Sequence, residues 1–180
     1  MTSLSVIGTA GRKPVGDRIN LELYNKAYNA LVEYVESLNI LAKDLLLISG
    51  GAAFADHLAV RFYNEYYKSG IKLLLHMPAQ FDKGNSEFYG NKDANIANNY
   101  HQLFSQKCKI NSLNEISQAY KNGMLDRIHD GFFARNRLVA LGQNMIAFTF
   151  SSTGEPADGG TSNTWKQCKG NKLHIDLGSL

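Results

Sequence analysis

Short apolar runs that end at turn-forming residues alternate with longer amphipathic stretches along this chain. Runs that are apolar at nearly every position are typical of strands buried on both faces of a parallel sheet. The amphipathic stretches have helical periodicity and can supply the crossover connections that parallel strands require. The five runs span residues 4–7, 45–48, 71–75, 145–150 and 173–177. The sequence therefore predicts an α/β protein, a Rossmann-like three-layer sandwich with a mostly parallel sheet of at least five strands.

The stretches between these runs predict the helices. Apolar side chains recur every three or four positions in four segments, which are residues 21–38, 54–67, 132–141 and, more briefly, 161–169. Residues 80 to about 130 form a polar insertion after the third strand, with helices expected near 93–107 and 112–122. A chain of 180 residues fits one domain, residues 1–180, that includes this insertion.

The charge balance is mildly basic. Nineteen Lys and Arg residues against sixteen Asp and Glu residues give a formal net charge of +3. This excess suits an anionic ligand, but it falls short of the dense basic face of a dedicated duplex-DNA binder. Hydrophobic residues make up 44% of the chain, which supports a sizeable core and excludes a disordered protein.

The sequence indicates a soluble cytoplasmic protein without a membrane partner. Residues 1–13 place a short apolar run before glycines and lack the basic start of a signal peptide. The longest apolar runs are too short to span a bilayer. Cys108 and Cys168 have no CxxC or CxxH around them, so we expect two reduced thiols. Self-association into a homo-oligomer stays open.

Four glycine-rich or polar junctions fall at or near the expected carboxyl ends of strands, where open parallel sheets bind ligands. Glycine lets a backbone approach a phosphate closely, and the N-terminus of a following helix favours an anion. A single junction of this kind is more often only a tight turn, whereas several on one edge indicate a phosphate- or nucleotide-binding crevice. The junctions are residues 8–13, 49–52, 151–158 and 159–164.

The familiar nucleotide motifs are absent from the sequence. Gly11 is followed by Arg12, Lys13 and Pro14 rather than by GK[ST], and Gly8 with Gly11 falls short of the GxGxxG fingerprint. The histidines and cysteines form no metal-binding pair at helical or loop spacing, and no GxSxG elbow is present. We therefore expect neither a P-loop NTPase nor an ordinary NAD dehydrogenase, and no metal or cofactor.

Four segments resemble, in the same order, elements of the DprA/LOG-like (SLOG) Rossmann superfamily. Residues 49–56, SGGAAFAD, are similar to its SGGAxGxD segment, and residues 133–140, FARNRLVA, to the RNR helix start of DprA proteins. Residues 6–9, VIGT, resemble the first strand and loop, and residues 159–161, GGT, the late GGT element of smaller members. Together these segments cover most of the strand–loop–helix framework.

The resemblance implies a domain that binds a nucleotide or a nucleotide derivative between its glycine loops. Arg135 and Asn136 would contact phosphate or sugar, although Arg135 and Arg137 alone have the spacing of a solvated pair at a helix end. Asp56 would either hydrogen-bond a sugar hydroxyl or stabilise the dipole of its own helix. The expected ligand-binding residues are Gly8, Thr9, Arg12, Ser49, Gly50, Gly51, Asp56, Arg135, Asn136, Gly159, Gly160, Thr161, Asn163 and Thr164.

The sequence departs from the LOG pattern where that family carries its catalytic group. LOG enzymes have a PGGxGTxxE element whose glutamate takes part in cleaving an N-glycosidic bond. Here Lys166 stands in place of that glutamate, and Asp158 replaces the proline. Phe54 also replaces the second glycine of the SGGAxGxD segment. These departures argue against LOG-type phosphoribohydrolase activity.

Three functions stay open at this point. The leading one is binding of a phosphate-bearing nucleotide or nucleotide-derived small molecule, as a sensor, a sequestering protein or a hydrolase. A second is a LOG-like nucleotide N-glycosidase that uses unusually placed carboxylates. Its candidate carboxylates are Glu87, Glu155 and Asp158, and the alternative is that they are solvated loop charges. A third is a minimal DprA-like module for single-stranded DNA, which we expect to bind weakly at this net charge. Residues 88–90 are expected to form a lid over the ligand.

Overall fold

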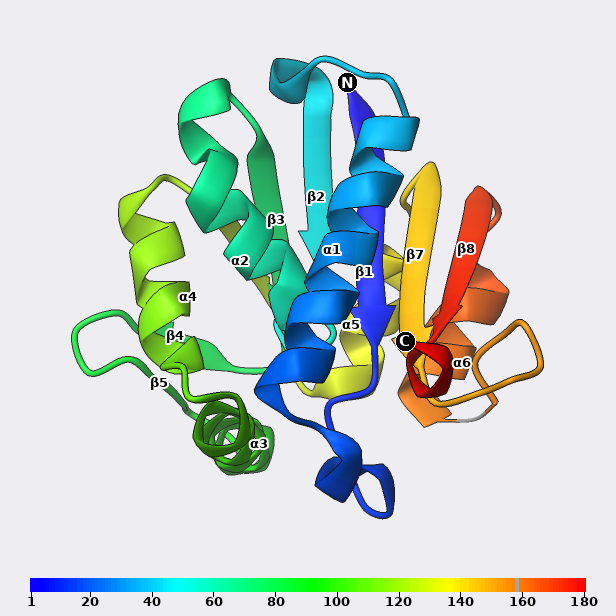
Figure 1. The fold of residues 1–180 in the computed structure, drawn as a ribbon. Helices are drawn as coiled ribbons and strands as arrows, with labels where there is room; N and C mark the ends of the chain where they lie inside the picture. Colours follow the sequence, from blue (N-terminus) through cyan, green and yellow to red (C-terminus); the bar gives the residue numbers. More distant parts are fainter. Residues whose placement is uncertain (158) are drawn as a thin grey trace.

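The computed structural model describes residues 1–157 and 159–180. Its main sheet has six strands that all run parallel, in the order β6-β3-β2-β1-β7-β8 (Figure 1). This architecture confirms the predicted α/β, Rossmann-like three-layer sandwich. The strands are β1 (Thr2–Gly8), β2 (Leu45–Ser49), β3 (Lys72–Met77), β6 (Leu125–Ile128), β7 (Asn144–Thr149) and β8 (Asn171–Asp176).

Helices cover both faces of the sheet. Figure 1 shows α1 (Leu21–Ser37) and α2 (His57–Tyr66) on the near face, with α5 (Phe132–Val139) and α6 (Gly159–Gln167) behind it. Four short 3-10 turns complete the connections: η1 (Val15–Arg18), η2 (Ala42–Asp44), η3 (Tyr67–Ser69) and η4 (Leu177–Ser179). None of the helices in the described part of the chain is long and apolar enough to cross a membrane.

The core lies mainly between the sheet and the α1–α2 layer. Helix α1 buries a stripe of side chains at helical spacing, which are Tyr24, Ala27, Tyr28 and Leu31. A smaller apolar cluster lies under α5 and α6 and includes Ile7, Met145 and Trp165. The central strands are buried on both faces, which is why their sequences are continuously apolar.

The insertion contains the two predicted helices and three strands that the sequence did not predict. The helices are α3 (Lys92–Cys108) and α4 (Ser112–Lys121), and a hairpin of β4 (Gln80–Asp82) and β5 (Glu87–Tyr89) precedes them. The chain then adds β6 to the edge of the main sheet beside β3. Within the expected lid, Phe88 belongs to β5, is 2% exposed and packs on Phe81 and His101. Phe88 is therefore a core side chain, whereas Tyr89 and Gly90 are exposed.

Candidate functional site

The first loop of the site follows β1 and cannot tolerate a side chain at its start. A Cβ on Gly8 would lie 2.2 Å from the carbonyl oxygen of Phe148 and 2.5 Å from the Cβ of Ala55. Thr9 continues the sheet by donating its N–H to Phe148, and its hydroxyl accepts from the N–H of Gly11. Glycine is thus required at this carboxyl end because β7 and the start of α2 lie directly against the backbone.

This close approach yields a prediction for Gly8→Ala. We expect the substitution to lower the free energy of unfolding by about 2–3 kcal/mol, because the backbone of β7 must shift to admit the methyl group. Urea denaturation followed by circular dichroism measures the loss. Gly160→Ala is the matched control, since the nearest atom to its added Cβ would be 3.8 Å away. Equal stability of the two variants would contradict the prediction.

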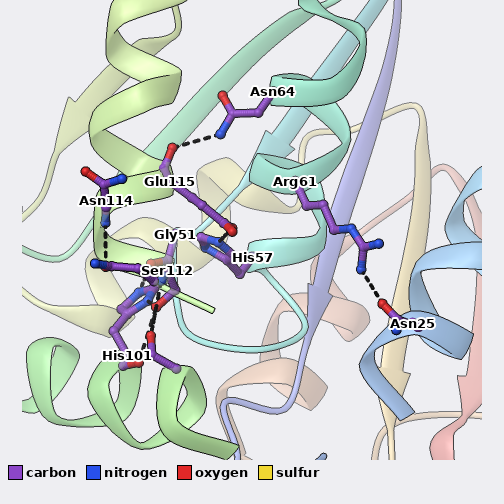
Figure 2. Close-up of polar contacts among 11 residues, drawn as sticks. Asn25, Gly51, His57, Arg61, Asn64, His101, Ser112, Asn114 and Glu115 are labelled. Atoms are coloured by element: carbon purple, nitrogen blue, oxygen red, sulfur yellow. Dashed lines mark hydrogen bonds and ion pairs between the residues drawn. The ribbon is translucent and has the colours of Figure 1, made fainter. Parts of the chain in front are cut away.

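The second loop follows β2, and two side chains from distant helices hold its carbonyl groups. The Nε2 of His101 on α3 donates to the carbonyl of Gly51 at 3.0 Å, and its Nδ1 accepts from the hydroxyl of Ser112 at 2.9 Å (Figure 2). The Nη1 of Arg135 on α5 donates to the carbonyl of Gly50. Gly51 has φ +68°, a conformation that glycine adopts without strain. The loop is therefore fixed from two sides.

Ser49 and Asp56 make hydrogen bonds to the backbone beside and within this loop. Ser49 is fully buried, and its hydroxyl donates to the carbonyl of Val6 at 2.7 Å. A carboxylate oxygen of Asp56 accepts from the N–H of Ala52 at 3.3 Å. Burial raises the pKa of Asp56, while the charge of Arg135 acts in the opposite direction. The hydroxyl of Ser49 is thus already paired inside the protein, and Asp56 makes no hydrogen bond from its side chain to cap α2.

Arg135 is largely buried and retains hydrogen-bonding capacity. Its exposed fraction is 6%, and burial lowers the pKa of its guanidinium to about 10. Of its nitrogen atoms, Nη1 has acceptors among the described residues, the carbonyls of Gly50 and, at 3.5 Å, of His76. Nε and Nη2 have no acceptor among the described residues, and neither atom is sealed from solvent. Nη2 lies 2.9 Å from the place that a Gly50 Cβ would take, so it faces the glycine loop.

Asn136, the next residue of α5, is also largely buried and also keeps free hydrogen-bonding groups. It is 8% exposed, and its side-chain amide makes no hydrogen bond to any residue that the structure describes. Its Nδ2 lies 3.8 Å from the place of a Gly160 Cβ, so it faces the start of α6. A polar group that is so deeply buried normally has a partner. Asn136 and Arg135 therefore lie among the glycine loops at the carboxyl edge of the sheet, a region that we call the crevice.

The start of α6 closes the crevice on its other side. The hydroxyl of Thr161 donates to the carbonyl of Gly8 at 2.9 Å, which joins the third loop to the first. Gly159 has φ +71°, and Gly160 leaves open space toward Asn136. Two other predicted ligand residues point elsewhere. The hydroxyl of buried Thr164 donates to the carbonyl of Gly160, and exposed Asn163 accepts from Gln167 along the helix.

Arg12 and two aromatic rings form the outer rim of the crevice. The guanidinium of exposed Arg12 lies 5.4 Å from the ring centre of Tyr100 and 5.6 Å from that of Phe132. Arg135 contacts the same Phe132 ring at 5.0 Å. The N–H of Phe132 donates to the carboxylate of Asp93, so the start of α5 already has an anionic partner. The positive charge that can meet a ligand therefore comes from the two arginines and from α6.

A histidine pair next to Arg135 was not predicted from the sequence. The Nδ1 of His76, at the end of β3, lies 2.9 Å from the Nε2 of His129, which follows β6. Burial, reinforced by His129, Arg127 and Arg135, lowers the pKa of His76 to about 4. The pair is therefore neutral at pH 7. No sequence signal links these two histidines, because they meet only when β6 joins the sheet beside β3.

The two candidate carboxylates that the structure describes are not buried beside Arg135 and Asn136. Glu87 is exposed on β5, where it pairs across the hairpin with Asp82, and Glu155 is exposed in the loop after β7. Asp158 lies outside the described residues. In the described part of the chain, no three His, Cys, Asp or Glu side chains lie close enough together to hold a metal ion. Two surface cavities, of about 500 and 690 Å³, lie outside the crevice.

No family model matches the chain. The chain is 34% identical over 179 residues to a protein of Acanthamoeba polyphaga mimivirus described as "Uncharacterized protein R261". The match covers 97% of this chain and 95% of the viral protein. The two proteins are thus similar from end to end, with the insertion included.

Proposed function

The chain belongs to the same family as the mimivirus protein, and we propose that it binds a phosphate-bearing nucleotide or nucleotide-derived small molecule at the carboxyl edge of its sheet. The backbone at Gly8, Gly50 and Gly160 would line the ligand, and Arg135 and Asn136 would contact its phosphate or sugar. The viral protein's printed name assigns no ligand, so the proposal depends on the geometry of this crevice.

One observation carries the proposal. Two neighbouring polar side chains, each more than nine-tenths buried, keep hydrogen-bonding groups without a partner among the described residues. Asn136 faces Gly160, beside which a ligand has room, whereas Arg135 and Asp56 fill the space beside Gly50. Because these groups still reach solvent, a polar ligand would replace water at them, and each hydrogen bond to a charged group would add about 1.5–3 kcal/mol to binding.

The charges favour a phosphate group. Arg135 offers the planar fork that matches phosphate oxygens, and the free N–H groups at the start of α6 favour an anion. Tyr100 and Phe132 beside Arg12 present aromatic surface at the rim, on which a base can stack. The combination of an anion-binding floor and an aromatic rim suits a mononucleotide better than inorganic phosphate alone.

Binding without hydrolysis agrees best with the carboxylates. A glycosidase needs a carboxyl group at the scissile bond. Of the described carboxylates, Asp56 is the one beside Gly50, and it already accepts the N–H of Ala52. We therefore propose a sensor or sequestering role, with N-glycosidase activity as the alternative. A single-stranded DNA module would need a longer basic track than Arg12 and Arg135 provide.

Calorimetric titration tests the proposal. We expect a nucleoside 5′-monophosphate, taken from the four common bases, to bind more tightly than its nucleoside. Asn136→Ala should weaken this binding about tenfold, equal to about 1.4 kcal/mol for a hydrogen bond to a charged group. Gly160→Ala should weaken it further by narrowing the crevice, while the fold tolerates the methyl group.

The matched control is Arg137→Ala, which removes an exposed arginine from the same helix. It should leave nucleotide binding unchanged. Equal binding of nucleotide and nucleoside would contradict the phosphate contact. Tight oligonucleotide binding at physiological salt, without mononucleotide binding, would favour the DNA module instead.

A further inference from the structure

Helix α5 presents apolar side chains to solvent and polar ones to the interior. Phe133 is 78% exposed and Leu141, directly after the helix, is 68% exposed, whereas Arg135 and Asn136 are buried. Phe133, Arg137 and Leu141 follow one another at four-residue spacing and therefore lie along one side of the helix. Phe133 and Leu141 are the two most exposed large apolar side chains among the described residues, and exposed apolar surface can mark a binding site.

A cavity lies beside Leu141, between the C-terminal ends of α5 and α6. Its volume is about 690 Å³, and its lining includes Arg137, Ala140, Leu141, Lys166 and Lys169. Gly142, Gln143 and Gly170, which also line it, belong to the loops that lead into β7 and β8, so the cavity lies at the amino edge of the sheet. It is therefore separate from the proposed nucleotide crevice, which lies at the carboxyl edge.

The charges around the cavity have one sign. Arg137, Lys166 and Lys169 are all exposed, and no acidic residue is among the described residues that line the cavity. Neither α5 nor α6 contains an Asp or a Glu. An exposed apolar residue surrounded by basic residues is complementary to an acidic segment that carries an apolar side chain as its anchor.

We propose that this surface, formed by Phe133, Arg137, Leu141, Lys166 and Lys169, docks an acidic amphipathic segment of another protein. The apolar side chains of the segment would occupy the cavity beside Leu141, and its carboxylates would pair with the three basic residues. A second copy of this chain is a poorer occupant, because a two-fold interface would set this basic surface against itself. A lipid bilayer is flat and would leave the cavity unfilled, and a nucleic acid would leave the exposed apolar side chains unused.

Fluorescence anisotropy with a labelled synthetic helix tests the proposal. The probe has leucines at helical i, i+4 and i+7 positions and glutamates elsewhere, and a matched peptide carries lysines in place of the glutamates. We expect the acidic peptide to bind and the basic one not to bind. Lys166→Glu with Lys169→Glu should weaken binding of the acidic peptide at least tenfold, and Leu141→Ser at least fivefold. These residues are exposed, so the variants should fold normally.

Lys121→Glu, an exposed lysine on α4, is the control and should leave peptide binding unchanged. Equal binding of both peptides, or equal binding to the charge-reversed variant, would overturn the proposal. So would a concentration-dependent dimer abolished by Leu141→Ser, or binding only to anionic phosphatidylserine vesicles or an oligonucleotide. Nucleotide titration of the same variants keeps this test independent of the crevice, because its residues are not altered.

Discussion

Replacing Arg135 with alanine is expected to lower the free energy of unfolding by about 3–5 kcal/mol, the range for removing one partner of a buried charge pair. Arg135 and Asp56 both lie beside Gly50, whose Cβ position is 2.8 Å from the guanidinium carbon and 2.7 Å from a carboxylate oxygen. The variant leaves Asp56 buried without its counter-charge and the carbonyl of Gly50 without its donor. Urea denaturation measures the loss.

A double-mutant cycle separates the charge pair from the lost packing. Asp56→Asn alone removes the larger of the two counter-charges on Arg135 and leaves Asp93, so it should also destabilise the protein. The combination of Asp56→Asn with Arg135→Met should lose at least about 1 kcal/mol less than the sum of the losses of Asp56→Asn alone and Arg135→Met alone. Strict additivity of the two losses would show that the pair is not coupled. Because Arg135 supports the fold, its substitution is a poor test of ligand binding, and Asn136 serves that purpose better.

Acidification from pH 7 to pH 4 is expected to destabilise the protein strongly. Burial lowers the pKa of His76 to about 4 and that of His101 to about 3. In the unfolded chain both imidazoles take up a proton near pH 6.5, whereas the folded protein resists protonation until much lower pH. The unfolded state therefore binds more protons below pH 6.5, and stability falls with pH by up to about 1.4 kcal/mol per unit for each histidine. Denaturant titrations at several pH values measure this slope.

The variant His101→Gln assigns part of the slope to one residue. Glutamine keeps an N–H group that can donate to the carbonyl of Gly51, and it does not titrate. The free energy of unfolding of the variant should thus depend less on pH between pH 6 and pH 4, by about the contribution of one histidine. This expectation holds whatever the stability of the variant at pH 7. An unchanged slope would mean that His101 does not carry the effect.

The sequence predicts the fold well where burial dictates it. Strands such as β1 and β7 are enclosed on both faces, so continuous apolar runs identify them. Strand β6 escapes the same analysis because Leu125, Arg127 and Ile128 are exposed at the edge of the sheet. The hairpin strands β4 and β5 are only three residues long, too short for a periodic signal.

The site was harder to predict than the fold. Glycine positions follow from strand ends, and the structure does bring Gly8, Gly50 and Gly160 to one edge of the sheet. The partners of their carbonyls do not follow from spacing. His101 looks like any scattered histidine in the sequence, yet it holds Gly51 from an inserted helix. Ser49 illustrates the reverse, because a serine in a glycine loop suggests ligand contact whereas its hydroxyl bonds to the neighbouring strand.

The hydrogen bonds that close the crevice have a consequence for the order of events during synthesis. They join residues 50 positions apart at His101 and Gly51, 85 apart at Arg135 and Gly50, and 153 apart at Thr161 and Gly8. Ribosomes add roughly 5–20 residues per second, so the loop that is made first must wait longest for its last contact. A nascent chain that ends before Thr161 lacks the far wall of the crevice. A small molecule that fits this crevice can therefore stabilise only the nearly complete polypeptide, and it cannot guide the earlier steps of folding.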